Sequence, residues 1–146
     1  MLVEFTDGKV FVTDYNIHIV LRKMRLDLRK AYQLQEIIAI ISKEISENGF
    51  TDEDYCLYSH EDMLTPEVVC YLETYPTISS DDKDVYPNFV VMESLELLYY
   101  GEQFEDVLMN VQSQIEEPTT DEYISALDYY SKHDVFMDFK SQGGRK

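Results

Sequence analysis

Neighbouring carboxylates are the most obvious chemical groups in this sequence. Asp81, Asp82 and Asp84 lie within one short segment and could bind a cation weakly through their oxygens. The segment lacks the ligand spacing, the central glycine and the final bidentate glutamate of an EF-hand loop. Acidic groups such as Asp52-Glu53-Asp54 and Glu116-Glu117 recur along the chain, so no one pair stands out as catalytic. We therefore interpret these carboxylates as surface charge rather than as a metal centre.

Histidine and cysteine do not occur in a pattern that indicates catalysis or metal binding. His18, His60 and His133 have no second histidine or cysteine at the spacing of a zinc site, and we expect structural or capping roles for them. Cys56 and Cys70 do not form a CxxC motif, and without an export signal we expect reduced thiols in the core. The sequence also lacks a glycine-rich phosphate loop and a nucleophile elbow. We therefore expect neither an enzyme nor a cofactor.

The composition is strongly acidic. The 146 residues include 29 Asp and Glu against 12 Lys and Arg, which gives a formal net charge of −17. Apolar residues make up 45% of the chain, which is enough for a hydrophobic core. The negative charge repels the phosphates of nucleic acids and of anionic membranes. It is compatible with a highly soluble or salt-adapted surface, and equally with a surface that binds a cationic partner.

The location in the cell follows from two further features. No apolar run approaches the roughly 20 residues of a membrane span. The N-terminal segment lacks the basic start and the apolar stretch of a signal peptide. We therefore expect a cytoplasmic protein without membrane contact.

The charge is unevenly distributed along the chain. Residues 22–30 contain five basic residues and one acid, Asp27, whereas residues 31–139 contain 25 acids and three lysines. The molecule is therefore polarised in sequence, with its negative charge concentrated after residue 30.

Tyrosine is abundant, with 12 residues, and two pairs are adjacent. In Tyr99-Tyr100 and Tyr129-Tyr130, one ring can face the core while its neighbour faces solvent. A tyrosine can simply cover the edge of a core, but exposed tyrosines beside carboxylates suit lysine and arginine, through cation–π contacts and charge-assisted hydrogen bonds. The candidate partner-binding residues are Asp81, Asp82, Asp84, Tyr99, Tyr100, Glu102, Glu105 and Asp106.

The first half of the chain predicts a mixture of strands and one long helix. Residues 2–12 read as a hairpin around Asp7-Gly8, and residues 17–24 fit a helix or a strand. Apolar spacing predicts a helix over about 27–47, which Asn48-Gly49 would end. Strands are expected at 55–58 and 68–74, followed by an exposed acidic loop over 75–84.

The second half alternates between strands and helices. We expect a short helix from Pro87 to about Glu93, a strand over 95–100 and an amphipathic helix over about 104–114. A last helix would begin after a cap at Thr119 or Thr120. The elements predict an α+β or α/β fold over residues 1–139, a single layered domain with a small sheet packed against several helices, followed by a flexible tail over 140–146.

The C-terminal half resembles a known family. The resemblance covers about residues 66–139 and depends on Tyr86-Pro87-Asn88-Phe89, on residues 95–107 (LELLYYGEQFEDV) and on residues 126–136 (ALDYYSKHDVF). These segments resemble small acidic immunity proteins of bacterial contact-dependent growth inhibition systems. The resemblance implies a cytoplasmic monomer that binds one cognate toxin domain, the C-terminal domain of a large exported protein and often a nuclease.

These observations favour a binding protein as the function. The leading hypothesis is an immunity protein that neutralises a basic toxin domain by electrostatic steering and a few buried contacts. The first alternative is an acidic nucleic-acid mimic that inhibits a DNA-binding enzyme. The second alternative is a carboxylate-rich metal hydrolase.

Overall fold

Strands and helices alternate through most of the computed structural model, which describes residues 26–49 and 54–140. The hairpin expected at 2–12, the ambiguous segment 17–24 and the tail after Lys140 lie outside the described residues. The described elements are β1 (Ala31–Gln33), α2 (Leu34–Asn48), β2 (Cys56–Ser59), β3 (Val69–Glu73), β4 (Thr77–Ile78), β5 (Asp84–Val85), α3 (Asn88–Met92), β6 (Glu96–Tyr100), α4 (Gly101–Gln114) and α5 (Thr120–His133).

The central sheet has the strand order β1-β3-β2-β6, and all of its pairs are antiparallel. Leu57 faces Leu72 and Tyr58 faces Tyr71 across the β2–β3 pair. Because side chains alternate along a strand, the leucines and the tyrosines lie on opposite faces of the sheet. The antiparallel pairing decides between the two expected classes, and the fold is α+β.

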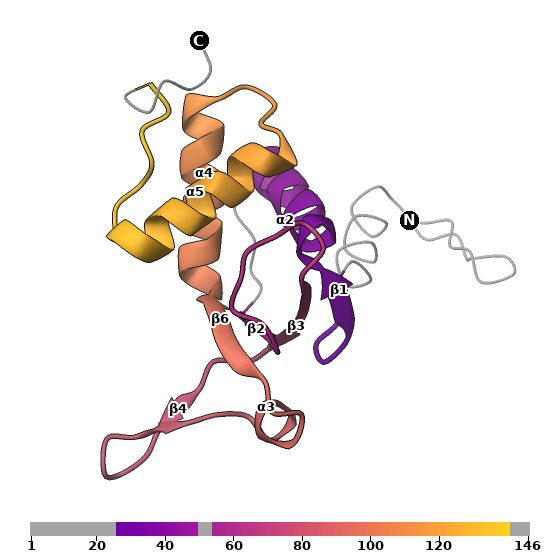
Figure 1. Cartoon of the computed structure of the whole chain (residues 1–146), viewed down its shortest axis with the longest axis vertical. Helices are drawn as coiled ribbons and strands as arrows, with labels where there is room; N and C mark the ends of the chain where they lie inside the picture. The colour runs from indigo at the N-terminus through magenta and orange to yellow at the C-terminus, as the bar shows by residue number, and fades with distance from the viewer. Residues whose placement is uncertain (1–25, 50–53, 141–146) are drawn as a thin grey trace, which may run out of the picture.

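Helices α2, α4 and α5 cover one face of this sheet (Figure 1). The side chains between the layers are aliphatic for the most part, and burying each leucine or isoleucine stabilises the fold by about 1.5–3 kcal/mol. The fully buried members include Leu34, Ile37, Ile38, Ile41, Leu57, Leu72, Phe104, Val107, Leu108 and Leu127.

The opposite face of the sheet has a smaller, aromatic core. Cys56, Tyr58, Val90 and Leu95 are buried there, and partly buried aromatic rings pack around them. Cys56 belongs to this core, whereas Cys70 belongs to the core under the helices. Both thiols are free and buried, as the sequence predicted.

The prediction of a helix over residues 27–47 is wrong at the start of the helix. The segment Ala31–Gln33 is strand β1, which pairs with the edge of β3, and the helix begins at Leu34. The Gln33 N–H donates to the Glu36 carboxylate (2.8 Å), which satisfies one of the free donors at the helix start. Pairing with a sheet edge is a long-range contact, so helical spacing in the sequence does not reveal it.

Other helix boundaries agree with the predictions. Gly49 has a left-handed φ of 85° and ends α2, as Asn48-Gly49 indicated. Thr119 caps α5, because its hydroxyl accepts from the Glu122 N–H (3.1 Å) while the Glu122 carboxylate accepts from the Thr119 N–H (2.9 Å). Among the described residues, no helix has both the length and the apolar character that crossing a membrane requires.

Candidate partner-binding surface

The segment predicted as an acidic loop is in fact a small hairpin. Thr77 pairs with Val85 and Ile78 pairs with Asp84, and we call residues 77–85 the β4–β5 arm. Its turn is closed by two backbone hydrogen bonds, from the Ser79 N–H to the Lys83 carbonyl (2.8 Å) and from the Asp82 N–H to the Ser79 carbonyl (3.0 Å). The arm extends away from the helical layer (Figure 1). Short-range polarity predicted its exposure but not its pairing.

The arm presents charged and apolar side chains together. Asp81, Asp82 and Asp84 are all exposed at its tip and along β5. Ile78 is 65% exposed and Val85 is 48% exposed, although both are aliphatic. Ile78 and Val85 are therefore not buried in either core. The arm offers a partner both negative charge and exposed apolar area.

A tyrosine joins the base of the arm to the start of α4. The ring of Tyr75 stacks on the ring of Tyr100, with centroids 6.0 Å apart and planes at 22°. The Tyr75 hydroxyl also accepts a hydrogen bond from the Glu102 N–H (2.8 Å). Burial raises the pKa of the Tyr75 hydroxyl above its usual value, so it stays protonated at neutral pH. Tyr75 was not among the residues predicted to bind a partner, because its position before Pro76 indicated only a loop.

The acidic residues at the start of α4 have different environments. Glu102 and Asp106 are exposed, whereas Glu105 is half-buried and accepts a hydrogen bond from the Tyr55 hydroxyl (3.0 Å). Glu105 therefore helps to hold α4 against the segment before β2. Glu102 lies beside the Tyr75–Tyr100 stack and is the α4 acid most directly connected to the arm.

The adjacent tyrosines of β6 face opposite ways, as expected. Tyr99 is 5% exposed, packs edge-on against Phe104 and donates its hydroxyl to the Leu127 carbonyl (2.9 Å). Tyr100 is 37% exposed. Burial also raises the pKa of the Tyr99 hydroxyl, which therefore stays neutral inside the core. Of the two rings, Tyr100 is the more exposed to solvent.

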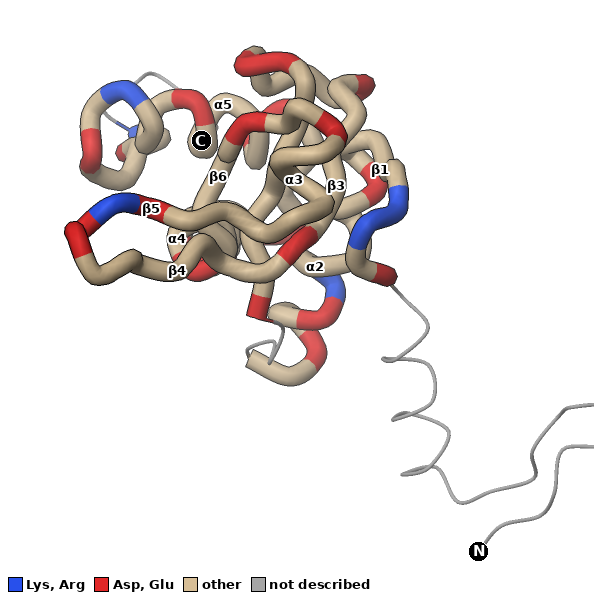
Figure 2. The backbone as a smooth tube through the Cα atoms, turned by 90° about the horizontal axis from the view of Figure 1, so that it is seen from below, with Lys and Arg blue, Asp and Glu red and all other residues tan. Residues whose placement is uncertain are grey.

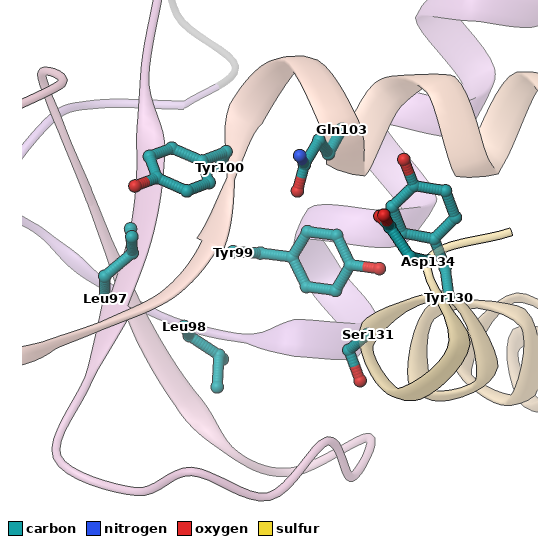
Figure 3. Close-up of a pocket in the computed structure, with 8 residues that line it drawn as sticks. All are labelled: Leu97, Leu98, Tyr99, Tyr100, Gln103, Tyr130, Ser131 and Asp134. Carbon is teal, nitrogen blue, oxygen red and sulfur yellow. The ribbon is translucent and has the colours of Figure 1, made fainter.

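A pocket of about 210 Å³ lies where the end of β6, the start of α4 and the end of α5 meet. Figure 3 shows Tyr99 pointing from β6 toward α5, with Gln103, Tyr130 and Asp134 around it. Leu97 and Tyr100 point to the other side of the strand. The remaining lining residues are Leu98 and Ser131.

Acidic residues are spread over the molecule rather than gathered on one face. Figure 2 shows them on the arm, near β6 and around α2. The basic pair Arg29-Lys30 directly precedes β1, which lies at the opposite end of the sheet from the arm in Figures 1 and 2. The Arg29 guanidinium binds the buried carboxylate of Glu73 (2.7 and 3.0 Å). Arg29, one of the basic residues of the segment 22–30, therefore has a structural contact within the protein.

The two described histidines each contact a neighbouring group of the fold. The His60 Nε2 lies 2.8 Å from the Glu93 carbonyl, and the His133 ring packs on Tyr129 with centroids 4.2 Å apart. His18 lies outside the described residues. Within residues 26–49 and 54–140, no three His, Cys, Asp or Glu side chains come together as a metal site would require.

Comparison with known proteins gives one family match. The model of a domain family of unknown function, DUF7716, matches residues 30–139. No curated protein and no solved structure shows significant similarity to the chain. The matched range covers every helix and strand described above.

Proposed function

The chain belongs to the DUF7716 family, and since that family has no known function, we propose from the chain's own residues that it is a binding protein for a basic partner protein. The observation that carries this proposal is the β4–β5 arm. It holds Asp81, Asp82 and Asp84 away from the body, next to exposed Ile78 and Val85. Charge and apolar area on one projecting element are the two components of a protein-binding surface.

The two components would act at different stages of binding. The net charge of −17 attracts a cationic partner from a distance and raises the association rate, and this effect weakens as salt is added. After contact, Ile78, Val85 and Tyr100 would lose water against the partner and slow its dissociation. The Tyr75–Tyr100 stack and the hydrogen bond from the Glu102 N–H would hold the arm in place for this contact.

The partner that we propose is one cognate toxin domain, and the protein would be its immunity protein. The resemblance of residues 66–139 to immunity proteins of contact-dependent growth inhibition supports this choice. A toxin that binds nucleic acid carries a basic cleft, which an acidic inhibitor can cover. In this proposal the protein acts in the cytoplasm as a monomer, without a cofactor and without catalysing a reaction.

The proposal expects a gene for a large exported protein beside the gene for this chain, and the test uses the C-terminal domain of that exported protein. The two purified proteins should form a one-to-one complex, and the complex should lack the nuclease activity of the free toxin domain. If the domain does not bind, the immunity proposal fails. If the protein instead captures several unrelated DNA-binding proteins with similar affinity, it is a nucleic-acid mimic and not an immunity protein.

Paired variants test the role of the arm. Asp81→Asn with Asp82→Asn removes two charges from the arm, and asparagine tolerates the positive φ of 64° at Asp82. Glu117→Gln with Asp121→Asn removes one charge from the α4–α5 connection and one from the first turn of α5, at the end of the molecule away from the arm (Figure 1). We expect the first pair to slow association on the order of tenfold at low salt, and the second pair to have a much smaller effect. Equal effects of the two pairs would show that the arm has no special role.

A further inference from the structure

The pocket between β6, α4 and α5 contains three polar groups that the fold does not use. The Gln103 amide, the Tyr130 hydroxyl and the Asp134 carboxylate all line it. None of the three forms a hydrogen bond or an ion pair with another described residue. Figure 3 shows the three groups around the same opening. We call this cavity the Asp134 pocket.

The aromatic walls of the Asp134 pocket are held rigidly. Tyr99 forms the inner wall, and its hydroxyl is already bound to the Leu127 carbonyl (2.9 Å). The Tyr130 ring packs on Phe136, with centroids 5.3 Å apart. The pocket therefore offers the aromatic side chains as surfaces and keeps the Tyr130 hydroxyl, the Gln103 amide and the Asp134 carboxylate for hydrogen bonding.

The position of Asp134 in the fold adds to the negative potential. Asp134 has a left-handed φ of 60° and ends α5, where its N–H donates to the Tyr130 carbonyl (2.8 Å). The C-terminal end of a helix carries partial negative charge from its last carbonyl groups. The nearby cation Lys132 is bound to Asp128 (2.9 Å) and the His133 ring packs on Tyr129, so each already has a contact on α5 itself.

We propose that the Asp134 pocket binds the guanidinium group of an arginine that the basic partner presents. A planar guanidinium can stack on tyrosine, pair with a carboxylate and donate to an amide oxygen and a hydroxyl at the same time. The cavity of about 210 Å³ is smaller than the roughly 300–1,000 Å³ of pockets for drug-sized ligands, and suits one side-chain head group. This assignment rests on the proposed function, because the partner supplies the arginine.

The first experiment titrates the full chain with N-acetylarginine amide, followed by NMR of the backbone amides. We expect saturable shifts at Gln103, Tyr130, Ser131 and Asp134, and none with N-acetylcitrulline amide, which has nearly the same shape without the charge. Asp134→Asn should weaken binding at least about fivefold, since a charge-assisted contact becomes a neutral one. Asparagine accepts the left-handed backbone at this position, so the fold is preserved.

The control variant is Asp84→Asn, which removes one charge from the arm and leaves the Asp134 pocket unchanged. It should bind N-acetylarginine amide as the unaltered chain does. Equal shifts with the citrulline compound, or equal weakening by Asp84→Asn and Asp134→Asn, would overturn the assignment. Tyr130→Phe keeps the ring contact with Phe136 and should weaken binding less than Asp134→Asn.

The second experiment separates this inference from the proposed function. Asp134→Asn is tested for affinity to the toxin domain, beside the Asp81→Asn, Asp82→Asn pair. If the arm variant weakens the complex and Asp134→Asn does not, the partner proposal stands and the arginine assignment fails. If N-acetylarginine amide binds the pocket but the toxin domain binds neither the unaltered chain nor the variants, the pocket chemistry stands and the partner proposal fails.

Discussion

Tyr75 and Tyr100 stack on each other although 24 residues and three secondary structure elements separate them, with ring centroids 6.0 Å apart. Tyr75 is separated from the β4–β5 arm only by Pro76, and Tyr100 directly precedes α4. The contact therefore determines how the arm leaves the body of the molecule. An arm that is held at its base loses less conformational entropy on binding than a free loop would.

The first prediction is that the stack restrains the arm. Tyr75→Ala removes both the ring and the acceptor for the Glu102 N–H, so the arm should open more often. Trypsin should then cleave after exposed Lys83 several times faster, whereas cleavage after Lys43 in α2 should not change. Tyr75→Phe keeps the ring but loses the hydrogen bond, at a cost of about 1 kcal/mol. Its rate of cleavage after Lys83 should lie between the rates of the unaltered chain and of Tyr75→Ala. Cleavage after Lys83 at the same rate in all three proteins would show that the stack does not restrain the arm.

The second prediction concerns the close approach of β6–α4 to the chain before β2. A Cβ atom at Gly101 would overlap the backbone carbonyl of Tyr55, and Tyr55 itself is 1% exposed. Gly101→Ala should therefore destabilise the fold by about 2–4 kcal/mol, because backbone has to move. The matched control is Gly49→Ala, where a φ of 85° is strained but nothing lies within 4 Å of the new atom. It should cost about 1 kcal/mol in urea denaturation, and an equal loss in the two variants would contradict the overlap.

Local patterns in the sequence predicted the elements that local chemistry decides. The Asn48-Gly49 stop, the Thr119 cap and the outward Tyr100 beside the inward Tyr99 all depend on neighbouring residues. The alternation of strands and helices predicted a layered domain, but the choice between α+β and α/β depended on the antiparallel strand pairing in the structure. The acidic, exposed character of residues 81–84 was also readable from composition alone.

Long-range contacts account for what the sequence did not reveal. Residues 31–33 have helical spacing, yet they form β1 because the edge of β3 is available to pair with them. The Asp134 pocket brings together Gln103, Tyr130 and Asp134, which come from two helices and lie beside the end of β6. His133-Asp134 marks a helix end in the sequence, but only tertiary packing places β6 next to it.

The third prediction is that the Arg29–Glu73 pair anchors the segment before β1. Glu73 is 3% exposed and Arg29 is 53% exposed, so removing the arginine leaves a buried carboxylate without its cation. The Glu73 carboxylate keeps the hydrogen bond from the Thr74 N–H (3.0 Å), which limits the loss. Arg29→Asn should destabilise the protein by about 1–3 kcal/mol, and asparagine accepts the φ of 61° at this position.

A double-mutant cycle isolates the pair in the third prediction. Glu73→Gln in the Arg29→Asn background should cost less than Glu73→Gln alone, with a coupling of about 1 kcal/mol in urea denaturation. Additive effects would mean that the Arg29 side chain does not stabilise the fold through its contact with Glu73.

The fourth prediction concerns stability at high pH. Cys70 is completely buried under the helices, and burial raises the pKa of its thiol from 9.0 to about 12. The unfolded chain then loses the thiol proton near pH 9, while the folded chain keeps it up to about pH 12. Between these values the unfolded state binds fewer protons, so the free energy of unfolding falls as the pH rises. Below pH 9 the thiol is neutral in both states and contributes no pH dependence.

The variant that tests this linkage is Cys70→Ala. Urea denaturation at several pH values from about 8 to about 10.5 gives the slope of unfolding free energy against pH. Above pH 9 the unfolding free energy of the unaltered chain should fall more steeply than that of Cys70→Ala, by up to about 1.4 kcal/mol per pH unit, which is the value for one proton. The comparison of slopes cancels the loss of stability that the smaller side chain causes at every pH. Tyrosines with raised pKa values, such as Tyr58, affect both chains equally. Parallel slopes would therefore show that the Cys70 thiol ionises as readily in the folded protein as in the unfolded chain.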